Sequence, residues 1–483
     1  MTKLCFLPAL AQARLLRARK VSARELLQAA LDQYALHNDT LNAVVVADID
    51  RARRAAEAAD RRYARSKPLS PVDGVPMTIK ESFDWAGTPT TWGDPRFRDN
   101  IAATDSEAVR RMTAAGAVLY GKTNVPLLLA DWQTFNDIYG TTSNPWDVTR
   151  APGGSSGGSA VALATGMASL EVGSDIGASI RNPAHYCGVY GHKPSFGIVS
   201  LKGQTLTGSV SPSDISVGGP MARSARDLAA MMKILVGPAG PEAQAMTFAL
   251  PPAPQKKFKD FRVAVMLTAP ESEVDQPVQD LLLNLAHFLK RRVRKLSFEA
   301  RPAFTTAEAQ ENYITLLRAA TSRRQSDADF AANLSKAAGF ADADRSYQAT
   351  MTRAYVMRHR DWLNANERRH QMRLLWQAFF EDWDVLLCPA AASAAFPHDH
   401  EGERHSRTIA VNGHRVPTTD QLFWAGYSGN FYLPSTVAPM GLTPQGLPAG
   451  VQIIARSYGD MTAIRFAELL EKEFGGFTPP PGY

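Results

Sequence analysis

A run of small residues from 173 to 179, Gly-Ser-Asp-Ile-Gly-Ala-Ser, is the segment best suited to chemistry. Consecutive small residues let main-chain N–H groups converge on one point without steric obstruction. Such a cluster of donors is what the oxyanion of a tetrahedral acyl-transfer intermediate requires. Ser179, at the end of the run, would then be placed as a nucleophile. Because its hydroxyl is un-ionised at neutral pH, this chemistry also needs a base.

Lys80 is the candidate base. No histidine offers an obvious partner for Ser179, and the Gly-x-Ser-x-Gly pattern of a nucleophile elbow does not occur around it. A lysine can serve instead if burial lowers its pKa enough to leave it neutral. Lys80 ends the apolar run VPMTI at 75–79, where its side chain would emerge from a buried strand, whereas most other lysines lie in polar surroundings.

A second glycine–serine segment, GGSSGG at 153–158, lies between these two sites. Taken alone it could be a flexible linker, an anion-binding loop at a helix N-terminus or part of a catalytic site. Patterned apolar sequence follows it directly, which argues against a linker. It also lacks the GxxxxGK[ST] and GxGxxG arrangements of nucleotide-binding loops.

Together, three segments resemble the hallmark segments of the amidase signature family. They are GVPMTIKE at 74–81, GGSSGGSA at 153–160 and GSDIGASIRNPAHYCG at 173–188, and their spacing also agrees with that family. Further similarity lies in LNAVVV (41–46), YGTTSNPW (139–146), GGPMARSARDL (218–228) and GLPAGVQIIA (446–455). The resemblance covers the chain apart from roughly 240–380, where the family is variable.

This resemblance implies a role for each residue of a catalytic triad. Ser179 would be the acyl-accepting nucleophile, Ser155 would relay the proton, and Lys80 would be the general base and later the acid. A cis peptide bond is expected between Gly154 and Ser155. The implied reaction is hydrolysis of carboxylic amide C–N bonds through an acyl-serine, with release of an acid and ammonia or an amine. No cofactor and no metal are expected.

The resemblance also implies an oxyanion hole made by the main-chain N–H groups of Ile176, Gly177, Ala178 and Ser179. Ala178 departs from the family, which usually has glycine at this position. If φ is positive there, alanine would be strained by about 1 kcal/mol; if φ is negative, the change is harmless. Beside this loop, Asp175 and Arg181 could touch substrate, but an ion pair that holds the loop is the favoured interpretation.

In the family that this chain resembles, the regions that correspond to two aromatic-rich segments border the substrate cleft, which implies a largely apolar pocket that favours aryl or alkyl acyl groups. Its candidate residues are Trp132, Phe135, Tyr139, Trp424, Tyr427 and Phe431, with Tyr432 beside them. Core packing would explain some of these residues equally well. Histidine and acidic residues crowd into 393–415, but their spacing fits no metal pattern. We predict a mobile polar loop near the mouth of the cleft there.

The elements that must position these residues alternate between strands and helices. Short apolar runs at 75–79, 117–121 and 168–175 predict strands, and 105–115 and 156–166 predict helices. This alternation predicts an α/β fold with a largely parallel or mixed sheet covered by helices on both faces. The resemblance narrows it to the amidase signature fold, whose central mixed sheet is twisted and flanked by helices on both faces.

We expect a single amidase domain over residues 1–483. Its expected parts are N-terminal helices (1–66), a catalytic core that holds the triad (67–237), a variable helical cap (240–382), and a return to the core sheet that ends in a C-terminal helix (383–483).

Composition favours a cytoplasmic enzyme, and the resemblance implies a small-molecule amide as its partner. The net charge of +6 comes mostly from arginines along helical stretches that also carry acids, so we expect no nucleic-acid partner. No run of about 18 apolar residues predicts a membrane helix, and we expect no membrane partner. Cys5, Cys187 and Cys388 are an odd number without a CxxC pair, which indicates a reducing compartment. A homodimer is a family-level expectation.

Other functions remain open at this stage. A glutamine-dependent amidotransferase A-type subunit shares all three hallmark segments but works only with partner chains. A catalytically dead scaffold is disfavoured, because Lys80, Ser155 and Ser179 are all present. Esters or carbamates could be the substrates, because the same acyl-enzyme chemistry handles them.

Overall fold

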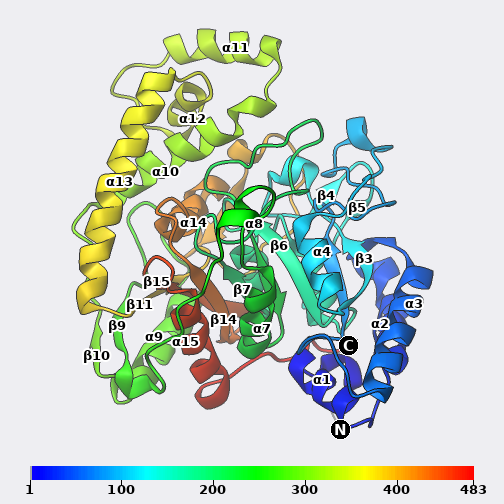
Figure 1. Cartoon of the computed structure of the whole chain (residues 1–483). Helices are drawn as coiled ribbons and strands as arrows, with labels where there is room; N and C mark the ends of the chain where they lie inside the picture. Colours follow the sequence, from blue (N-terminus) through cyan, green and yellow to red (C-terminus); the bar gives the residue numbers. More distant parts are fainter. Residues whose placement is uncertain (1–2) are drawn as a thin grey trace.

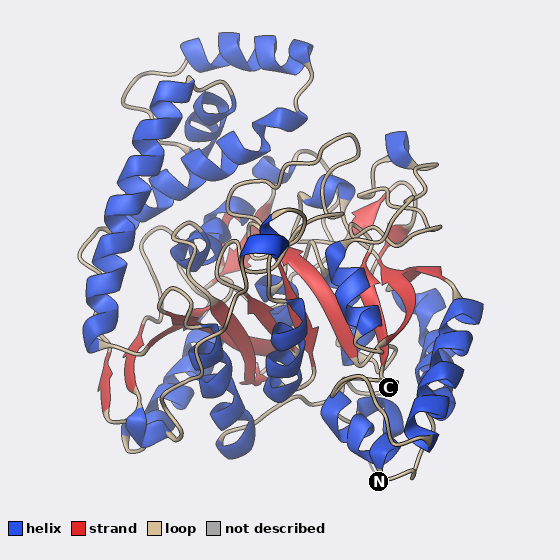
Figure 2. Cartoon of the chain, viewed as in Figure 1, coloured by secondary structure: helices blue, strands red, loops and turns tan. Residues whose placement is uncertain are grey.

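One large β-sheet runs through the molecule in the computed structural model, which describes residues 3–483 (Figures 1 and 2). Its strands are β1 (Val44–Ala47), β2 (Pro76–Lys80), β3 (Val118–Thr123), β6 (Leu170–Asp175), β7 (Tyr190–Lys193), β8 (Val217–Ala222), β9 (Arg262–Val265), β10 (Lys295–Ser297), β11 (Val385–Pro389), β14 (Ser435–Leu442) and β15 (Pro448–Ala455). Two small hairpins pair β4 (Phe135–Asn136) with β5 (Gly140–Thr141), and β12 (Thr408–Val411) with β13 (His414–Pro417).

The sheet is mixed. Within residues 3–483 its eleven strands follow the order β1-β3-β2-β6-β8-β7-β14-β15-β11-β9-β10. Strand β2 runs parallel to β3 and β6, and β9 runs parallel to β10 and β11. The remaining neighbours are antiparallel. The predicted α/β fold with a central mixed sheet is therefore confirmed.

Fifteen α-helices accompany the sheet in the described part of the chain. They are α1 (Ala9–Arg17), α2 (Ala23–Leu41), α3 (Ile49–Ala64), α4 (Glu107–Ala114), α5 (Gly157–Ala164), α6 (Arg181–Cys187), α7 (Ala225–Leu235), α8 (Glu242–Ala245), α9 (Gln276–Lys290), α10 (Thr306–Thr321), α11 (Asp327–Ala338), α12 (Tyr347–Tyr355), α13 (His359–Asp382), α14 (Leu422–Gly429) and α15 (Asp460–Glu473). Several begin at capping residues; Ser22, for example, accepts the N–H of Glu25 at the start of α2.

Helices cover both faces of the sheet, as predicted. Successive side chains of β3 alternate between two cores, as the two-residue period of a strand requires. Leu119 packs in the core shared with α4, α7, α9 and α15, whereas Val118 and Tyr120 pack in the core shared with α2, α3 and α5. A strand buried on both faces consists mainly of apolar residues, and β2 is such a strand.

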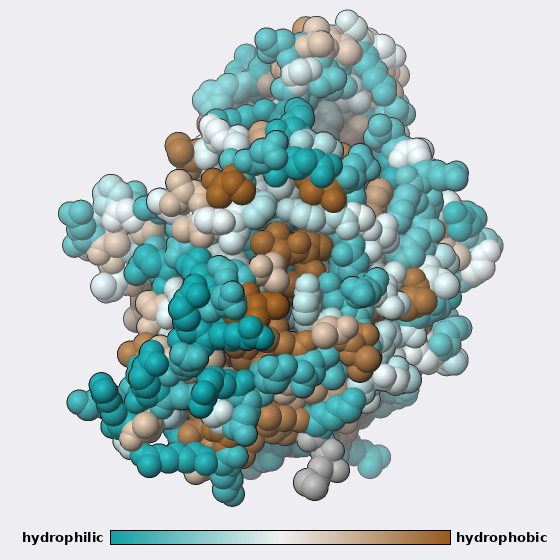
Figure 3. All heavy atoms as spheres, turned by 90° about the vertical axis from the view of Figure 1, so that its right-hand side faces the viewer, coloured by the Kyte–Doolittle hydropathy of each residue, from teal (hydrophilic) through white to brown (hydrophobic). Residues whose placement is uncertain are grey.

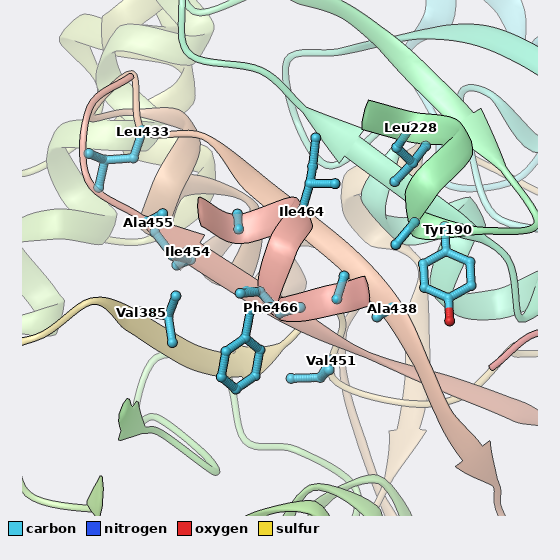
Figure 4. Close-up of a cluster of buried hydrophobic side chains, with 14 of the residues drawn as sticks. Tyr190, Leu228, Val385, Leu433, Ala438, Val451, Ile454, Ala455, Ile464 and Phe466 are labelled. Atoms are coloured by element: carbon cyan, nitrogen blue, oxygen red, sulfur yellow. The ribbon is translucent and has the colours of Figure 1, made fainter. Parts of the chain in front are cut away.

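The larger core lies between the sheet and helices α7 and α15. Figure 4 shows Leu228 of α7 and Ile464 and Phe466 of α15 beside the strand residues Val451 and Ile454. All five side chains are fully buried. This packing makes the central strands a rigid support for the loops at their ends.

The arginine-rich sequence at 306–382 forms helices α10 to α13, which rise from one end of the sheet (Figure 1). Helix α10 packs against α12, α13 and α14, and so joins this helical segment to the rest of the molecule. In Figure 1, α11 lies at the top and the long helix α13 runs down the left-hand side.

The prediction of a loop at 393–415 needs a correction, because this segment contains β12 and the start of β13. The hairpin turns at Asn412 and Gly413, both of which have positive φ. Within residues 3–483 we find no helix with the length and apolar character that crossing a bilayer requires. On the face shown in Figure 3, hydrophilic residues predominate and hydrophobic ones gather in a strip near the middle.

Candidate active site

The carboxyl ends of β2 and β6 bring the hallmark segments together. These strands are parallel neighbours, with Met77 opposite Leu170, so both chains leave the sheet at the same edge. Lys80 is the last residue of β2, and the loop that carries Ser179 follows β6 directly. Parallel strands place functional groups at this edge in many α/β proteins.

Lys80 is fully buried and held by three oxygen atoms. Its Nζ lies 2.6 Å from Ser155 Oγ, 3.0 Å from Ser174 Oγ and 3.4 Å from the Ser174 carbonyl oxygen. Burial lowers the pKa of Lys80 to about 7, although the carboxylate of Asp175 opposes this shift. The neutral, proton-accepting form of Lys80 is therefore accessible near neutral pH.

Ser155 lies at the turn before α5 and follows a cis peptide bond from Gly154. A Cβ atom at Gly154 would collide with the main-chain oxygen of Gln133, so only glycine fits there. The next residue, Ser156, donates its N–H to the carbonyl oxygen of Ser179 at 3.1 Å. The turn that carries Ser155 is thus tied directly to the loop that carries Ser179.

Asp175 holds the loop from 176 to 181. Its carboxylate accepts the N–H of Ala178 at 3.0 Å and the N–H of Ile180 at 3.1 Å. The Arg181 guanidinium donates to both carboxylate oxygens, at 2.8 and 3.0 Å. Burial would raise the pKa of Asp175, but the charge and hydrogen bonds of Arg181, together with the charge of Lys193 and the N–H of Ile180, outweigh burial and keep that pKa below its usual value. The structure thus shows the predicted ion pair between Asp175 and Arg181.

Ala178 needs a correction in the predicted oxyanion hole. Because its N–H is engaged by Asp175, it is not free to bind an oxyanion. The N–H groups of Ile176, Gly177 and Ser179 donate to no other described main-chain or side-chain group. Ala178 also has a φ of 71°, and at this positive value the backbone of an alanine is strained.

Two aromatic side chains fix the orientation of this loop. The Tyr313 hydroxyl of α10 donates to the Ile176 carbonyl oxygen at 2.9 Å, and Trp132 Nε1 donates to the Gly177 carbonyl oxygen at 2.7 Å. In a trans peptide the N–H points away from the carbonyl. Tyr313 therefore sets the direction of the Gly177 N–H.

A cavity of about 760 Å³ opens onto Ser155 and Ser179. The Ser179 hydroxyl makes no hydrogen bond to another described residue and lies at the wall of this cavity. The wall combines apolar side chains with polar and charged ones. The apolar members include Trp92, Leu128, Leu129, Trp132, Ile176, Leu317 and Leu422.

The predicted aromatic pocket is only partly found. Trp132 lines the cavity, but Trp424, Tyr427 and Phe431 lie in the larger core. The physical reason is that α14 is buried around its whole circumference, so aromatic residues at any position of it meet other protein. Outside the cavity wall, Phe135 stacks on His400, and the Tyr139 hydroxyl lies 3.4 Å from Glu81. Tyr432 instead donates to Asp214 at 2.5 Å.

Other residues at the site had no distinct signal in the sequence. Ser174 contacts Lys80. Gln204, which lines the cavity, donates from Nε2 to Ser174 Oγ over a distance of 3.2 Å. The predicted polar loop contributes Arg404 and its neighbours to the same wall. Among residues 3–483, no group of three or more histidine, cysteine, aspartate or glutamate side chains is arranged to hold a metal ion.

Comparison with known proteins agrees with this geometry. A sequence model of the family described as Amidase matches residues 25–464. The chain belongs to the amidase family. This amidase is 33% identical to the "Putative amidase AmiB2" of Mycobacterium bovis, over 97% of this chain and 96% of that protein. It is 31% identical to the A-type subunit of the glutamyl-tRNA(Gln) amidotransferase of Anaeromyxobacter sp. (strain K), over 96% of this chain and 95% of that one.

A solved structure is also similar to this amidase. The 6-aminohexanoate cyclic dimer hydrolase complexed with substrate superposes with a TM-score of 0.79 and is 25% identical, over 99% of both chains. The resemblance to the amidase signature fold that the sequence indicated is confirmed.

Proposed function

We propose that this amidase hydrolyses a carboxylic amide through a covalent acyl-serine, with Ser179 as nucleophile, Ser155 as proton relay and Lys80 as general base and acid. The observation that carries the proposal is the buried Lys80 Nζ, 2.6 Å from Ser155 Oγ, at the cavity that Ser179 also lines. A neutral amine there can donate its two hydrogens to the Ser174 oxygens and accept the proton of Ser155.

The proposed reaction has two halves. In the first, Ser155 accepts the Ser179 proton as it passes its own to Lys80, and Ser179 Oγ attacks the amide carbonyl carbon. The oxyanion is stabilised by the free N–H groups of Ile176, Gly177 and Ser179. The C–N bond then breaks, and the relay returns the proton to the departing amine. In the second half, water repeats these steps and releases the acid.

The proposed route needs no metal or cofactor, because a neutral lysine supplies the base. We further propose a cytoplasmic location. All three cysteines are buried free thiols, which suits a reducing compartment. A homodimer and the lack of a nucleic-acid partner stay predictions.

Treatment with a fluorophosphonate, followed by mass spectrometry, tests the proposed nucleophile. The wild type should gain one adduct at Ser179, and Ser179→Ala should gain none and lose roughly 10³-fold or more in kcat. Ser216→Ala is the matched control, because Ser216 lies on the wall of the same cavity and has no proposed role. An adduct at another serine, or an unlabelled wild type, would contradict the triad.

The similarity to an amidotransferase chain supports a second candidate, a protein that works only with partner chains. Assaying the isolated chain against small amides, esters and carbamates separates the two. Turnover by the isolated chain favours the free-standing hydrolase. Activity that appears only with partner chains and charged transfer RNA would favour the amidotransferase.

A further inference from the structure

Four arginine side chains on the cavity wall have no carboxylate partner in the described chain. One of them, Arg323, is exposed and donates to the Ser211 hydroxyl, and the other three are less exposed. They are Arg318 on α10, Arg324 on the turn that follows α10, and Arg404 on the turn Arg404–Ser406. Two carboxylates of this wall, Asp214 and Asp131, pair with arginines that do not line it. The wall therefore carries uncompensated positive charge within a partly enclosed space.

Arg318 is the most informative of the three. It is only 6% exposed, and its guanidinium donates to the Tyr347 hydroxyl. Its buried Nε has no hydrogen-bond partner in the described structure. Removing a cation from water without a counter-charge costs free energy, so such an arginine indicates an anion that binds there.

The other two arginines reinforce this charge. Arg324 donates to the Leu128 carbonyl oxygen at 2.8 Å and lies over the Trp92 ring, 5.5 Å from its centroid. Burial lowers the pKa of Arg324, and the charge of Arg318 lowers it further. Arg404 lies near Tyr347, the same phenol that Arg318 contacts. The positive charges of Arg318 and Arg324 thus repel each other at the cavity wall.

Three of the four carboxylates of this wall are already engaged. Asp214 pairs with Arg369 at 2.8 Å, and Asp131 pairs with Arg407 at 2.6 Å. Asp329 caps α11 and accepts the hydroxyl of Ser326 at 2.7 Å. Glu403 is exposed to solvent. None of these groups neutralises Arg318.

The position of Arg318 relative to the nucleophile sets the size of the ligand. Tyr313, whose hydroxyl binds the Ile176 carbonyl, lies five residues before Arg318 on α10. Five residues of α-helix rise about 7.5 Å. We therefore place an anion at Arg318 away from a carbonyl carbon at Ser179 and not beside it.

We infer that the substrate of this amidase carries a carboxylate several bonds from the scissile amide, and that Arg318, assisted by Arg324 and Arg404, binds it. The inference rests on the proposed function for the identity of the reacting bond. It replaces the neutral aryl or alkyl pocket predicted from the aromatic segments. The apolar wall residues would contact the carbon chain between the two groups.

The first test compares p-nitroanilides that differ only in one end group. The mono-p-nitroanilides of glutaric and adipic acid are paired with those of pentanoic and hexanoic acid, which have the same chain lengths. The wild type should show a kcat/KM about 10- to 100-fold higher on the acids, as expected for a charged hydrogen-bonded pair. Acyl-aminobenzoates paired with acylanilides test whether the carboxylate lies on the amine side instead.

Variants then assign the effect to the arginines. Arg318→Met should lose most of the preference for acids, because its kcat/KM on the acids should fall by a larger factor than its kcat/KM on the matched neutral anilides. Arg318→Lys should keep part of the preference. Arg404→Met should lose part of it as a second, independent variant. Arg360→Met is the control, because Arg360 is 76% exposed on α13 and lies outside the cavity. It should match the wild type on every substrate.

A binding measurement keeps the inference separate from catalysis. Glutarate should raise the Tm of Ser179→Ala, whereas 1,5-pentanediol, which has equal length and no charge, should not. A shift by glutarate without fluorophosphonate labelling of the wild type would refute the proposed nucleophile and support the anion site. If the wild type turned over the neutral anilides as well as or better than the matched acids, the inference would be overturned. It would also be overturned if glutarate did not raise the Tm of Ser179→Ala. Neither result would change the assignment of Ser179 as the nucleophile.

Discussion

At the scale of single residues, the burial of Lys80 decides the pH at which the proposed mechanism works. Desolvation brings the pKa of Lys80 to about 7, so its neutral, proton-accepting form grows as the pH rises through 7. On a neutral substrate, kcat/KM should rise about tenfold per pH unit below this value and level off above pH 8 or so. A pH–rate profile from about 5.5 to 10 measures this. A profile that still rises at the alkaline end would refute Lys80 as the base.

Ala178 is the second residue whose effect can be measured. Its positive φ costs alanine about 1–2 kcal/mol relative to glycine, whereas glycine's greater freedom in the unfolded chain offsets about 0.4–1 kcal/mol. Ala178→Gly should therefore raise the free energy of unfolding by up to about 1 kcal/mol and leave kcat unchanged. Urea unfolding measures it. Ala164→Gly, in the buried helix α5, should instead lower stability, and similar losses in both variants would contradict the argument.

At the scale of elements, α10 does more than join the helical segment to the rest of the molecule, because it also contacts the loop after β6. Tyr313 orients the Gly177 N–H through the Ile176 carbonyl. Tyr313→Phe should lower kcat about tenfold with little change in KM, because the N–H acts on the transition state more than on the bound substrate. Steady-state kinetics on a neutral amide test this.

Tyr63→Phe is the matched control for Tyr313→Phe. The Tyr63 hydroxyl also donates to a main-chain carbonyl at 2.9 Å, that of Asp73, but it lies in α3 away from the cavity. Both variants should lose about 1 kcal/mol of stability. Only Tyr313→Phe should lose kcat, and an equal kcat in both would show that Tyr313 is merely structural.

At the scale of the whole molecule, activity depends on how the helical segment 306–382 docks on the core. A Cβ atom at Gly426 of α14 would collide with the Tyr313 ring, so glycine lets α10 approach α14 closely. Gly426→Ala should destabilise the protein by about 1–3 kcal/mol and also lower kcat, because α10 carries Tyr313 and Arg318. Thermal unfolding and kinetics measure the two effects.

Gly429→Ala, in the same helix, tests whether the close approach matters. Its Cβ would lie 3.6 Å from its nearest neighbour, an ordinary contact, so stability and kcat should stay close to the wild type. If both glycine variants behaved alike, the docking of α10 against Gly426 would not control the site.

The sequence alone determined the family, the mixed α/β sheet and the identity of Lys80, Ser155 and Ser179 as candidates. These features depend on local patterns, because small residues in a loop and apolar residues in a strand act on their own neighbourhood. The spacing of the three hallmark segments then linked these local features to one family. Lys80 approaches the loop that carries Ser179 because two parallel strands end at one edge of the sheet, and the turn before α5 brings Ser155 within hydrogen-bond distance of Lys80.

Only the tertiary structure decided which side chains line the cavity. Arg318 and Arg404 are far apart in the sequence and lie among many other arginines, so composition could not separate a cavity residue from a solvated one. The aromatic residues of α14 misled the prediction because an apolar helix can face a cavity or a core with the same sequence. Likewise, the engagement of the Ala178 N–H by Asp175 depends on the folded loop, since hydrogen-bond direction is set by backbone geometry.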